Sequence, residues 1–142
     1  MDSDAPMIPL AFERLPPEAM EVRAQRVLER LQSRRSVRHF SPDPVPLDVV
    51  RRCIAAAAQA PSGANKQPWT FCLVSDPSLK AAIRAAAEAE ERAFYGGRAS
   101  ERWLADLKPF NTDAHKPFLE TAPALVVVFA QVKGPDNDQH YY

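Results

Sequence analysis

The chain has 142 residues, of which 46% are hydrophobic and 25% charged, and its formal net charge is zero. This length and composition are ordinary for one soluble globular domain with a core of its own. A balanced charge argues against a nucleic-acid or anionic-membrane partner, so any anion site must be local. The acidic, proline-containing start "MDSDAPMIPLAF" differs from a signal peptide, and no apolar run approaches the ~20 residues of a transmembrane helix. We therefore expect a cytoplasmic location and no membrane partner.

The two cysteines indicate neither a metal site nor a redox motif. Cys53 lies in helix-like sequence and Cys72 in strand-like sequence, and they form no CxxC. We expect two buried, reduced thiols, as in a cytosolic protein, and no bound metal.

The first half of the chain alternates proline-rich connections with helical patterns. The start is extended as far as residue 16, and a helix is expected from Pro17 to about Ser33. The polar connection "SRRSVRHFSPDPVP" follows. The next helix is expected from Asp48 to Gln59, and Pro61 ends it. A strand over "WTFCLVS", rich in β-branched and aromatic residues, comes after a short loop.

The second half begins with a long alanine-rich helix, "PSLKAAIRAAAEAEERAFY", which Pro77 opens and two glycines end. "RASERWLADL" predicts another helix, "KPFNTDAHKP" a loop, and "HKPFLETAP" a short helical turn. The last element, "ALVVVFAQV", is an apolar strand that favours a central place in a sheet. Because two strands make a poor sheet, we expect that more chain follows Tyr142 or that a partner completes the sheet.

"RRSVR" places three arginines and a serine within five residues. If the segment is extended, Arg34, Ser36 and Arg38 share one side. Guanidinium groups and a hydroxyl suit a phosphate ester. The alternative is a solvated basic helix end, which the helix dipole favours.

The connection "APSGANKQPW" carries unusual backbone and many polar groups. Gly63 lacks a Cβ and would let backbone N–H groups approach a ligand, while Ser62 and Asn65 add polar side chains. The alternative is a loop that only turns the chain.

"EAEERAFY" places Glu88, Glu91 and Tyr95 on one helix face, since Glu91 and Tyr95 are four residues apart and Glu88 is three before Glu91. A carboxylate and a phenol on one face could hold an ammonium group. The alternative is a solvated face with a half-buried tyrosine.

Together, the order of "RRSVR", "APSGANKQPWTF", the long helix and "TAPALVVVFAQVKG" resembles the FMN-dependent nitroreductase superfamily, and within it the iodotyrosine deiodinase branch. The likeness begins at "IPLAFERLPPEAM" and runs to the last residue. It implies an α+β, three-layer α/β/α fold whose central mixed or antiparallel sheet is flanked by helices. Residues 1–16 would be an extended segment, and 17–142 the N-terminal portion of a single, incomplete domain. Further helices and strands, a donor near flavin N5 and a distal arginine would lie beyond it.

The resemblance also assigns roles to individual residues. Arg34, Arg35 and Ser36 match the positions that bind the FMN phosphate and ribityl chain. Arg38 matches the cationic residue near the flavin pyrimidine edge. The loop that packs against the flavin corresponds to Pro61, Ser62 and Gly63. Arg38 would stabilise the anion of reduced flavin, and the N–H of Ala64 would meet the phenolate oxygen of the substrate, so both are catalytic candidates. Glu91, Tyr95 and Lys116 match the trio that binds an amino-acid group.

The implied activity is reductive dehalogenation of a halogenated tyrosine to tyrosine and halide. FMN would be the cofactor, NADP an associated electron carrier, and the assembly a homodimer with FMN at the interface. The trio supports this branch because a zwitterion needs partners for both of its charges. The alternatives are a general NAD(P)H-dependent nitro or quinone reductase, and a flavin-free, truncated paralogue that acts as a binding module.

Overall fold

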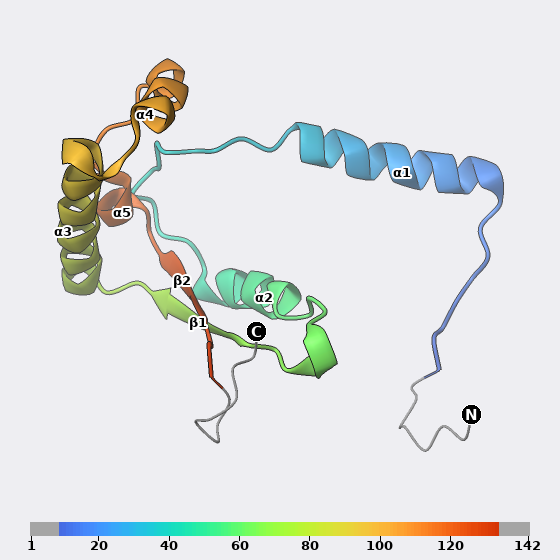
Figure 1. Ribbon diagram of the computed structural model, residues 1–142. Coiled ribbons are helices and arrows are strands. Elements are labelled where there is room, and N and C mark those ends of the chain that lie inside the picture. Colours follow the sequence, from blue (N-terminus) through green and yellow to red (C-terminus); the bar gives the residue numbers. More distant parts are fainter. Residues whose placement is uncertain (1–8, 134–142) are drawn as a thin grey trace. The chain divides into compact units, whose positions relative to one another are not determined.

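The computed structural model describes residues 9–133 and divides into two compact units, Met1–Val37 and Arg38–Tyr142 (Figure 1). Residues 1–8 of the expected N-terminal segment lie outside the described part. The expectation of a single domain over 17–142 stays a prediction, and each unit is described here by itself.

The first unit contains one helix, α1, over Pro17–Gln32. Pro17 occupies the first turn, where its missing N–H costs nothing, and Glu18 and Arg30 have the signs that suit the two helix ends. The predicted helix is therefore confirmed. No residue of α1 is buried, and apolar side chains such as Leu28 and Leu31 are exposed.

The second unit contains four helices and two strands within residues 38–133. They are α2 (Leu47–Ala57), β1 (Trp69–Val74), α3 (Pro77–Ala93), α4 (Glu101–Leu107), α5 (Phe118–Thr121) and β2 (Leu125–Ala130). All six agree with the expected order. The helix predicted from residue 98 begins only at Glu101, because the hydroxyl of Ser100 accepts a hydrogen bond from Trp103 N at 3.3 Å and caps it there. α3 ends in a wide turn over Phe94–Arg98, where Gly97 has φ of 144°.

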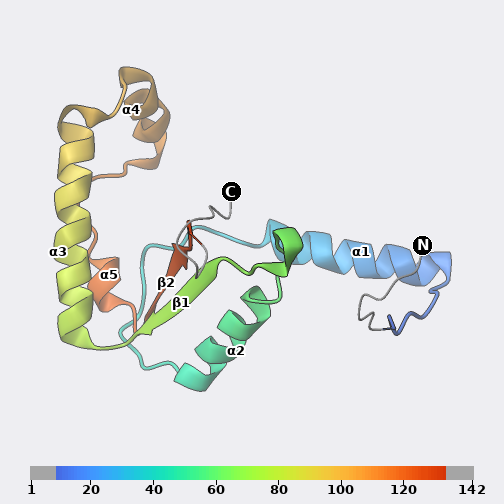
Figure 2. The ribbon, with the colours of Figure 1, turned by 60° about the horizontal axis from the view of Figure 1, so that its bottom comes forward.

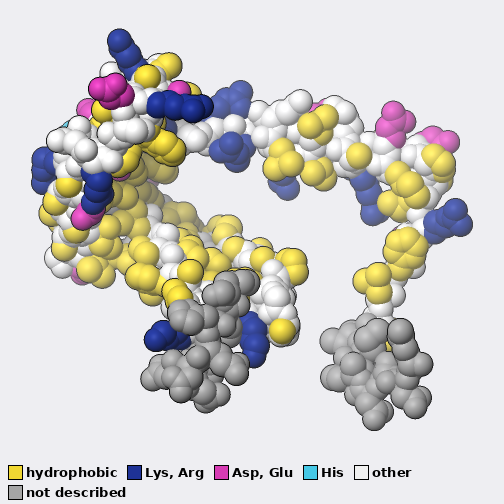
Figure 3. All heavy atoms as spheres, in the orientation of Figure 1, with side chains coloured by type: hydrophobic (Ala, Val, Ile, Leu, Met, Phe, Trp, Pro, Cys, Tyr) yellow, Lys and Arg dark blue, Asp and Glu magenta, His cyan; other side chains and the backbone are white. Residues whose placement is uncertain are grey.

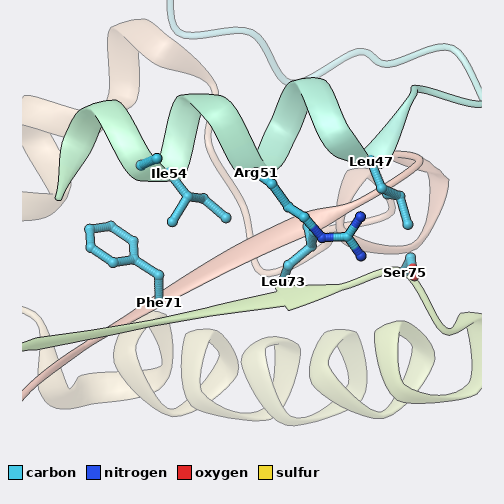
Figure 4. A pocket seen from close by; sticks show the side chains of 7 residues that line it. Leu47, Arg51, Ile54, Phe71, Leu73 and Ser75 are labelled. Carbon is cyan, nitrogen blue, oxygen red and sulfur yellow. The ribbon is translucent and has the colours of Figure 1, made fainter.

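The sheet of the described residues consists of β1 and β2, which pair antiparallel with Trp69 opposite Ala130 and Val74 opposite Leu125. The strands are far apart in sequence, and α3, α4 and α5 lie between them. α2 lies on one face of the two strands and α3 on the other, as Figures 2 and 4 show. This is the expected α/β/α layering, with an antiparallel sheet.

Burial concentrates where β1 runs into α3 and α5 runs into β2. Val74 and Ala122 are buried there together with Lys80, whose Nζ donates to the carbonyl oxygens of Glu120 at 3.0 Å and Ala122 at 2.7 Å. These bonds satisfy an ammonium group that would otherwise be costly to bury. They also tie α3 to the end of α5 and so fix the chain that leads from α5 into β2.

The expectation of two buried thiols is wrong. Both cysteines are free, but Cys53 is exposed and Cys72 is only partly buried. Cys53 is exposed because no described element covers its side of α2. Helical spacing identifies an apolar face, but only the packing of other elements decides whether that face is buried.

A shallow groove of about 410 Å³ lies between α2 and β1. Ile54 points from α2 toward the sheet and Phe71 points from β1 into the same space, with Arg51 between Leu47 and Leu73 (Figure 4). Hydrophobic side chains are also visible over much of the surface (Figure 3). Across residues 9–133, no helix combines the length and the apolar character needed to span a bilayer.

Candidate functional site

The site is built on one stripe that runs along α3 and into the turn Phe94–Arg98 that follows it. Asp76 caps this helix by accepting a hydrogen bond from Leu79 N at 2.8 Å, and alanines fill much of its length. Glu88, Glu91 and Tyr95 follow at intervals of three and four residues, which places them on one face. The sequence predicted this shared face.

The loop segment 112–116 lies against this stripe and contacts it through Thr112, His115 and Lys116. Tyr95 donates a hydrogen bond from its hydroxyl to Thr112 Oγ1 at 3.0 Å. Lys116 Nζ forms an ion pair with Glu91 Oε2 at 3.1 Å, and the Lys116 backbone N–H donates to Glu88 Oε1 at 2.8 Å. The structure thus brings together Glu91, Tyr95 and Lys116, the trio that the family resemblance singled out, and their role stays a prediction.

A cavity of about 530 Å³ opens beside these contacts. Its polar lining includes Arg38, Glu91, Tyr95, Thr112 and Lys116. Its apolar lining includes Phe94, Trp103 and Leu107. A carboxylate, an ammonium and a phenol at one end of an aromatic-lined cavity suit a ligand with both charges of an amino acid and a ring.

The charged side chains of this site are partly buried, which strengthens their electrostatic interactions. The Lys116 side chain is 16% exposed, and Glu91 is 36% exposed. Lys116 Nζ also donates to the carbonyl oxygen of Asp113 at 2.6 Å. The ammonium is therefore held at the cavity by one carboxylate and one carbonyl, which leaves a third donor for a ligand.

Glu88 has a different role from the one its position suggested. We considered it as a possible ammonium partner alongside Glu91. Its carboxylate instead accepts from Arg84 Nε at 2.8 Å and from the Lys116 N–H, and His115 Nδ1 lies 3.4 Å away. The bond from Arg84, followed by the bond from the Lys116 N–H, holds the pKa of Glu88 below its ordinary value. Arg84, whose pKa is raised mainly by Glu88 and next by Glu120, also bonds Glu120 Oε2 at 2.8 Å.

The loop that contains Pro61, Ser62, Gly63 and Ala64 folds as a tight turn of its own. Ser62 Oγ accepts from Gln67 N at 2.8 Å, and Ser62 O accepts from Asn65 N at 3.0 Å. Within residues 9–133, the N–H groups of Ser62, Gly63 and Ala64 donate no hydrogen bond. These consecutive donors remain available to an acceptor from outside the described chain.

The strained backbone of this loop lies at residues that the sequence pattern does not single out. Ala64, Asn65 and Gln67 have φ of 49°, 54° and 46°. For a residue with a Cβ such a conformation costs free energy and is concentrated at functional sites. Gly63 is not left-handed, and a Cβ added to it would meet nothing within 4 Å. The chain itself therefore does not require glycine at 63, and close approach by a ligand stays a prediction.

The arginine cluster is exposed and has no acidic partner among the described residues. Arg34, Arg35 and Ser36 follow α1 in the first unit, and Arg35 Nη1 donates to the carbonyl oxygens of Gln32 at 2.6 Å and Arg34 at 2.8 Å. Arg38 begins the second unit and lines the cavity. Within residues 9–133, no carboxylate lies within 4 Å of these three guanidinium groups.

Sequence reasoning missed three features of the site. Thr112, which receives the Tyr95 hydroxyl, was only part of an expected loop. Trp103 was assigned to a helix but not to a cavity wall. Glu88 was placed on the right face but not with its backbone partner. Each depends on how the loop 108–117 folds back onto α3, which side-chain periodicity does not encode.

Comparison with known proteins agrees with this geometry. The model of the nitroreductase family matches residues 31–142. Iodotyrosine deiodinase of Haliscomenobacter hydrossis is 50% identical over 139 residues, which are 95% of this chain and 63% of the relative. Iodotyrosine deiodinase 1 of Mus musculus is 43% identical over 139 residues, which are 95% of this chain and 49% of the relative.

A crystal structure of oxidized iodotyrosine deiodinase bound to FMN and 3-iodo-L-tyrosine has a TM-score of 0.71 and 34% sequence identity. The match covers 78% of this chain and 60% of that chain. The chain thus spans about half to just under two thirds of the relatives it matches. Since the family model covers well over half of the sequence and the sheet, helices and cavity fit the same architecture, the chain belongs to the nitroreductase family.

Proposed function

We propose that this chain belongs to an FMN-dependent reductive dehalogenase that converts a halogenated tyrosine to tyrosine and halide. The observation that carries the proposal is the single cavity lined by Glu91, Tyr95 and Lys116. Its relatives named iodotyrosine deiodinase, and the related structure holding FMN and 3-iodo-L-tyrosine, support the same assignment.

The residues of the chain fit the proposed cofactor. Arg34 and Arg35 are exposed and have no acidic partner among residues 9–133, as a phosphate ester would require. Ser36 adds a hydroxyl. In the second unit, the unused N–H groups of the 61–64 turn would face the flavin or the substrate. FMN, when bound, supplies the two electrons that the reaction consumes.

The chain would hold the substrate by its two charges and its phenol oxygen. Lys116 would pair with the carboxylate and Glu91 with the ammonium, and Tyr95 would hydrogen-bond to the same group. Ala64 N–H would donate to the phenolate oxygen, and Arg38 would contribute positive charge where electrons are delivered. Overall, the halotyrosine takes up two electrons and one proton, the carbon–halogen bond breaks, and tyrosine and halide leave.

We also propose a homodimer with FMN at its interface, acting in the cytoplasm with NADP as the electron carrier. α1 supports an assembly, because it buries no residue of its own and exposes Val27, Leu28 and Leu31. Sedimentation of the FMN-loaded protein tests it: we expect a dimer, and a stable flavin-loaded monomer would contradict the proposal.

The test of the activity is a titration of the complete, FMN-loaded protein. 3-Iodotyrosine should perturb the absorbance and fluorescence of FMN far more strongly than iodophenol at equal concentration, and under reducing conditions it should release iodide. Equal responses to iodotyrosine, iodophenol and a nitroarene, with turnover of the nitroarene, would favour a general nitro or quinone reductase. A colourless protein that takes up no FMN would favour a flavin-free binding module.

A further inference from the structure

We propose that Glu88 is a positioning residue that keeps Lys116 at the cavity when its ammonium leaves Glu91 for the carboxylate of a ligand. This inference rests on the proposed function, because it assumes that a zwitterionic ligand competes for Lys116 and Glu91. It concerns a residue that contacts neither the ligand nor the cofactor in that proposal.

The contacts that join segment 112–116 to Glu88, Glu91 and Tyr95 differ in what a ligand would do to them. Glu91, Tyr95, Thr112 and Lys116 all line the cavity, so a ligand that binds there competes for the Lys116–Glu91 and Tyr95–Thr112 contacts. Glu88 is not among the residues that line the cavity. Its bond to the Lys116 backbone N–H is therefore the contact that ligand binding leaves intact.

The carboxylate of Glu88 is itself well fixed. Its side chain is 15% exposed, and Oε1 accepts from Arg84 Nε at 2.8 Å as well as from the Lys116 N–H. Arg84 also binds Glu120 of α5, close after Lys116 in the chain. Arg92 lies 3.9 Å from Glu88 Oε2, and His115 contacts Oε1 at 3.4 Å. A fixed acceptor on a rigid helix suits the placement of a neighbouring loop.

The position of the Lys116 backbone decides where its ammonium can reach. The side chain is flexible, and its three donors turn freely around Nζ. Without Glu88, the only side-chain contacts named above that hold segment 112–116 would be the two that a ligand competes for, and the Lys116 backbone would keep just its bond from Leu119 N at 3.1 Å, within the start of α5. Binding would then have to order the segment as well as form new bonds, and affinity for a zwitterion would fall.

The test compares Glu88→Ala and Glu88→Gln with Asp48→Asn in the complete, FMN-loaded protein. Glu88→Gln keeps an oxygen acceptor for Arg84 and Lys116 but loses the charge, so it is the conservative variant. Asp48→Asn removes the carboxylate of an exposed pair with Arg51 at 2.7 Å on α2, outside the site, and serves as the matched control.

The first readout is the hydrogen exchange of the Lys116 amide, followed by NMR with [15N]lysine and no ligand present. We expect Glu88→Ala to exchange roughly tenfold faster than the wild type, as suits the loss of one charge-assisted hydrogen bond. Glu88→Gln should be intermediate, and Asp48→Asn unchanged. If Glu88→Ala is too unstable to study, the intermediate exchange expected of Glu88→Gln still decides the question.

The second readout is the Kd for 3-iodotyrosine and for iodophenol. Glu88→Ala should lose roughly tenfold in affinity for iodotyrosine and under about twofold for iodophenol. The inference would be overturned if the wild type prefers iodotyrosine and both Glu88 variants keep that preference and a protected Lys116 amide. The proposed function would remain supported in that case. No preference in the wild type would overturn the proposed function, and this inference with it.

Discussion

Removing one charge of the Glu91–Lys116 pair should weaken the binding only of ligands that carry the opposite charge. Lys116→Met removes the partner of a carboxylate, and Glu91→Gln removes the partner of an ammonium. A charge-assisted hydrogen bond contributes about 1.5–3 kcal/mol. The ligand must first displace an ion pair of 3.1 Å whose side chains are 16% and 36% exposed, and such partly solvated pairs contribute up to about 1 kcal/mol.

The variants have no such pair to displace, which offsets part of their loss. The expected net loss is therefore roughly 1–2.5 kcal/mol, which corresponds to about 5- to 60-fold in Kd. A much larger loss would mean that the pair is more desolvated in the ligand complex than in the structure. The estimate applies to each variant separately, since the two residues contact each other and their effects need not add.

The assay is calorimetric titration with four iodophenols that share the ring and differ in which charged groups their side chains carry. Iodotyrosine carries both charges, iodotyramine only the ammonium, iodohydroxyphenylpropionate only the carboxylate, and iodophenol neither. Lys116→Met should weaken the two ligands with a carboxylate, and Glu91→Gln the two with an ammonium. Lys108→Met is the matched control, because Lys108 is an exposed lysine of the same loop that does not line the cavity. Equal losses for iodophenol, or an equal effect of Lys108→Met, would refute the reasoning.

Four further outcomes follow from single contacts. Arg34→Ala should weaken FMN binding by about 1.5–3 kcal/mol in a flavin titration, and unchanged affinity would remove it from the phosphate site. Lys80→Met should lower the free energy of unfolding by about 1–3 kcal/mol in urea, because one buried and one partly buried carbonyl group lose their donor. Ala64→Gly should leave stability unchanged or raise it by up to about 1 kcal/mol, since φ there is 49°, whereas Ala85→Gly in the middle of α3 should lower it by about 0.5–1 kcal/mol. Because the pKa of Glu88 is lowered in the folded chain, its stabilising effect is present above the ordinary glutamate pKa and is lost as pH falls through the lowered one. Acid unfolding of Glu88→Gln should show a shallower loss of stability over that range, and parallel curves would contradict the contact.

Local patterns predicted the elements because each depends on neighbouring residues. Pro17 and Pro77 stand in the first turns of α1 and α3, and β1 is rich in β-branched and aromatic residues. The pairing of β1 with β2 could not be predicted in register, since the strands meet across three helices. Burial of Cys53 was predicted wrongly for a related reason: the sequence marks an apolar face but not what covers it.

The site, too, was predictable only where it depends on neighbouring residues. Helical spacing was enough to place Glu91 and Tyr95 on one helical face, and the family resemblance singled out Lys116. The bond from the Lys116 N–H to Glu88 joins residues 28 positions apart and involves a backbone group, so no side-chain pattern reveals it. The left-handed conformation of Ala64 was likewise hidden, because the sequence pointed to the neighbouring glycine as the special residue.

The pairing of Lys116 with Glu91 also explains how such a cavity could prefer amino acids and still admit simpler aromatic ligands. In the ligand-free chain each charge already has a partner, so neither is left alone in a partly desolvated place. Under the proposed function, a neutral phenol would leave that pair in place and gain only the apolar walls and the phenol-oxygen contact. A zwitterion would replace one ion pair by two. Preference for an amino acid would then arise from the difference between these two exchanges, so it should be seen as graded affinity and not as an absolute barrier to simpler aromatics.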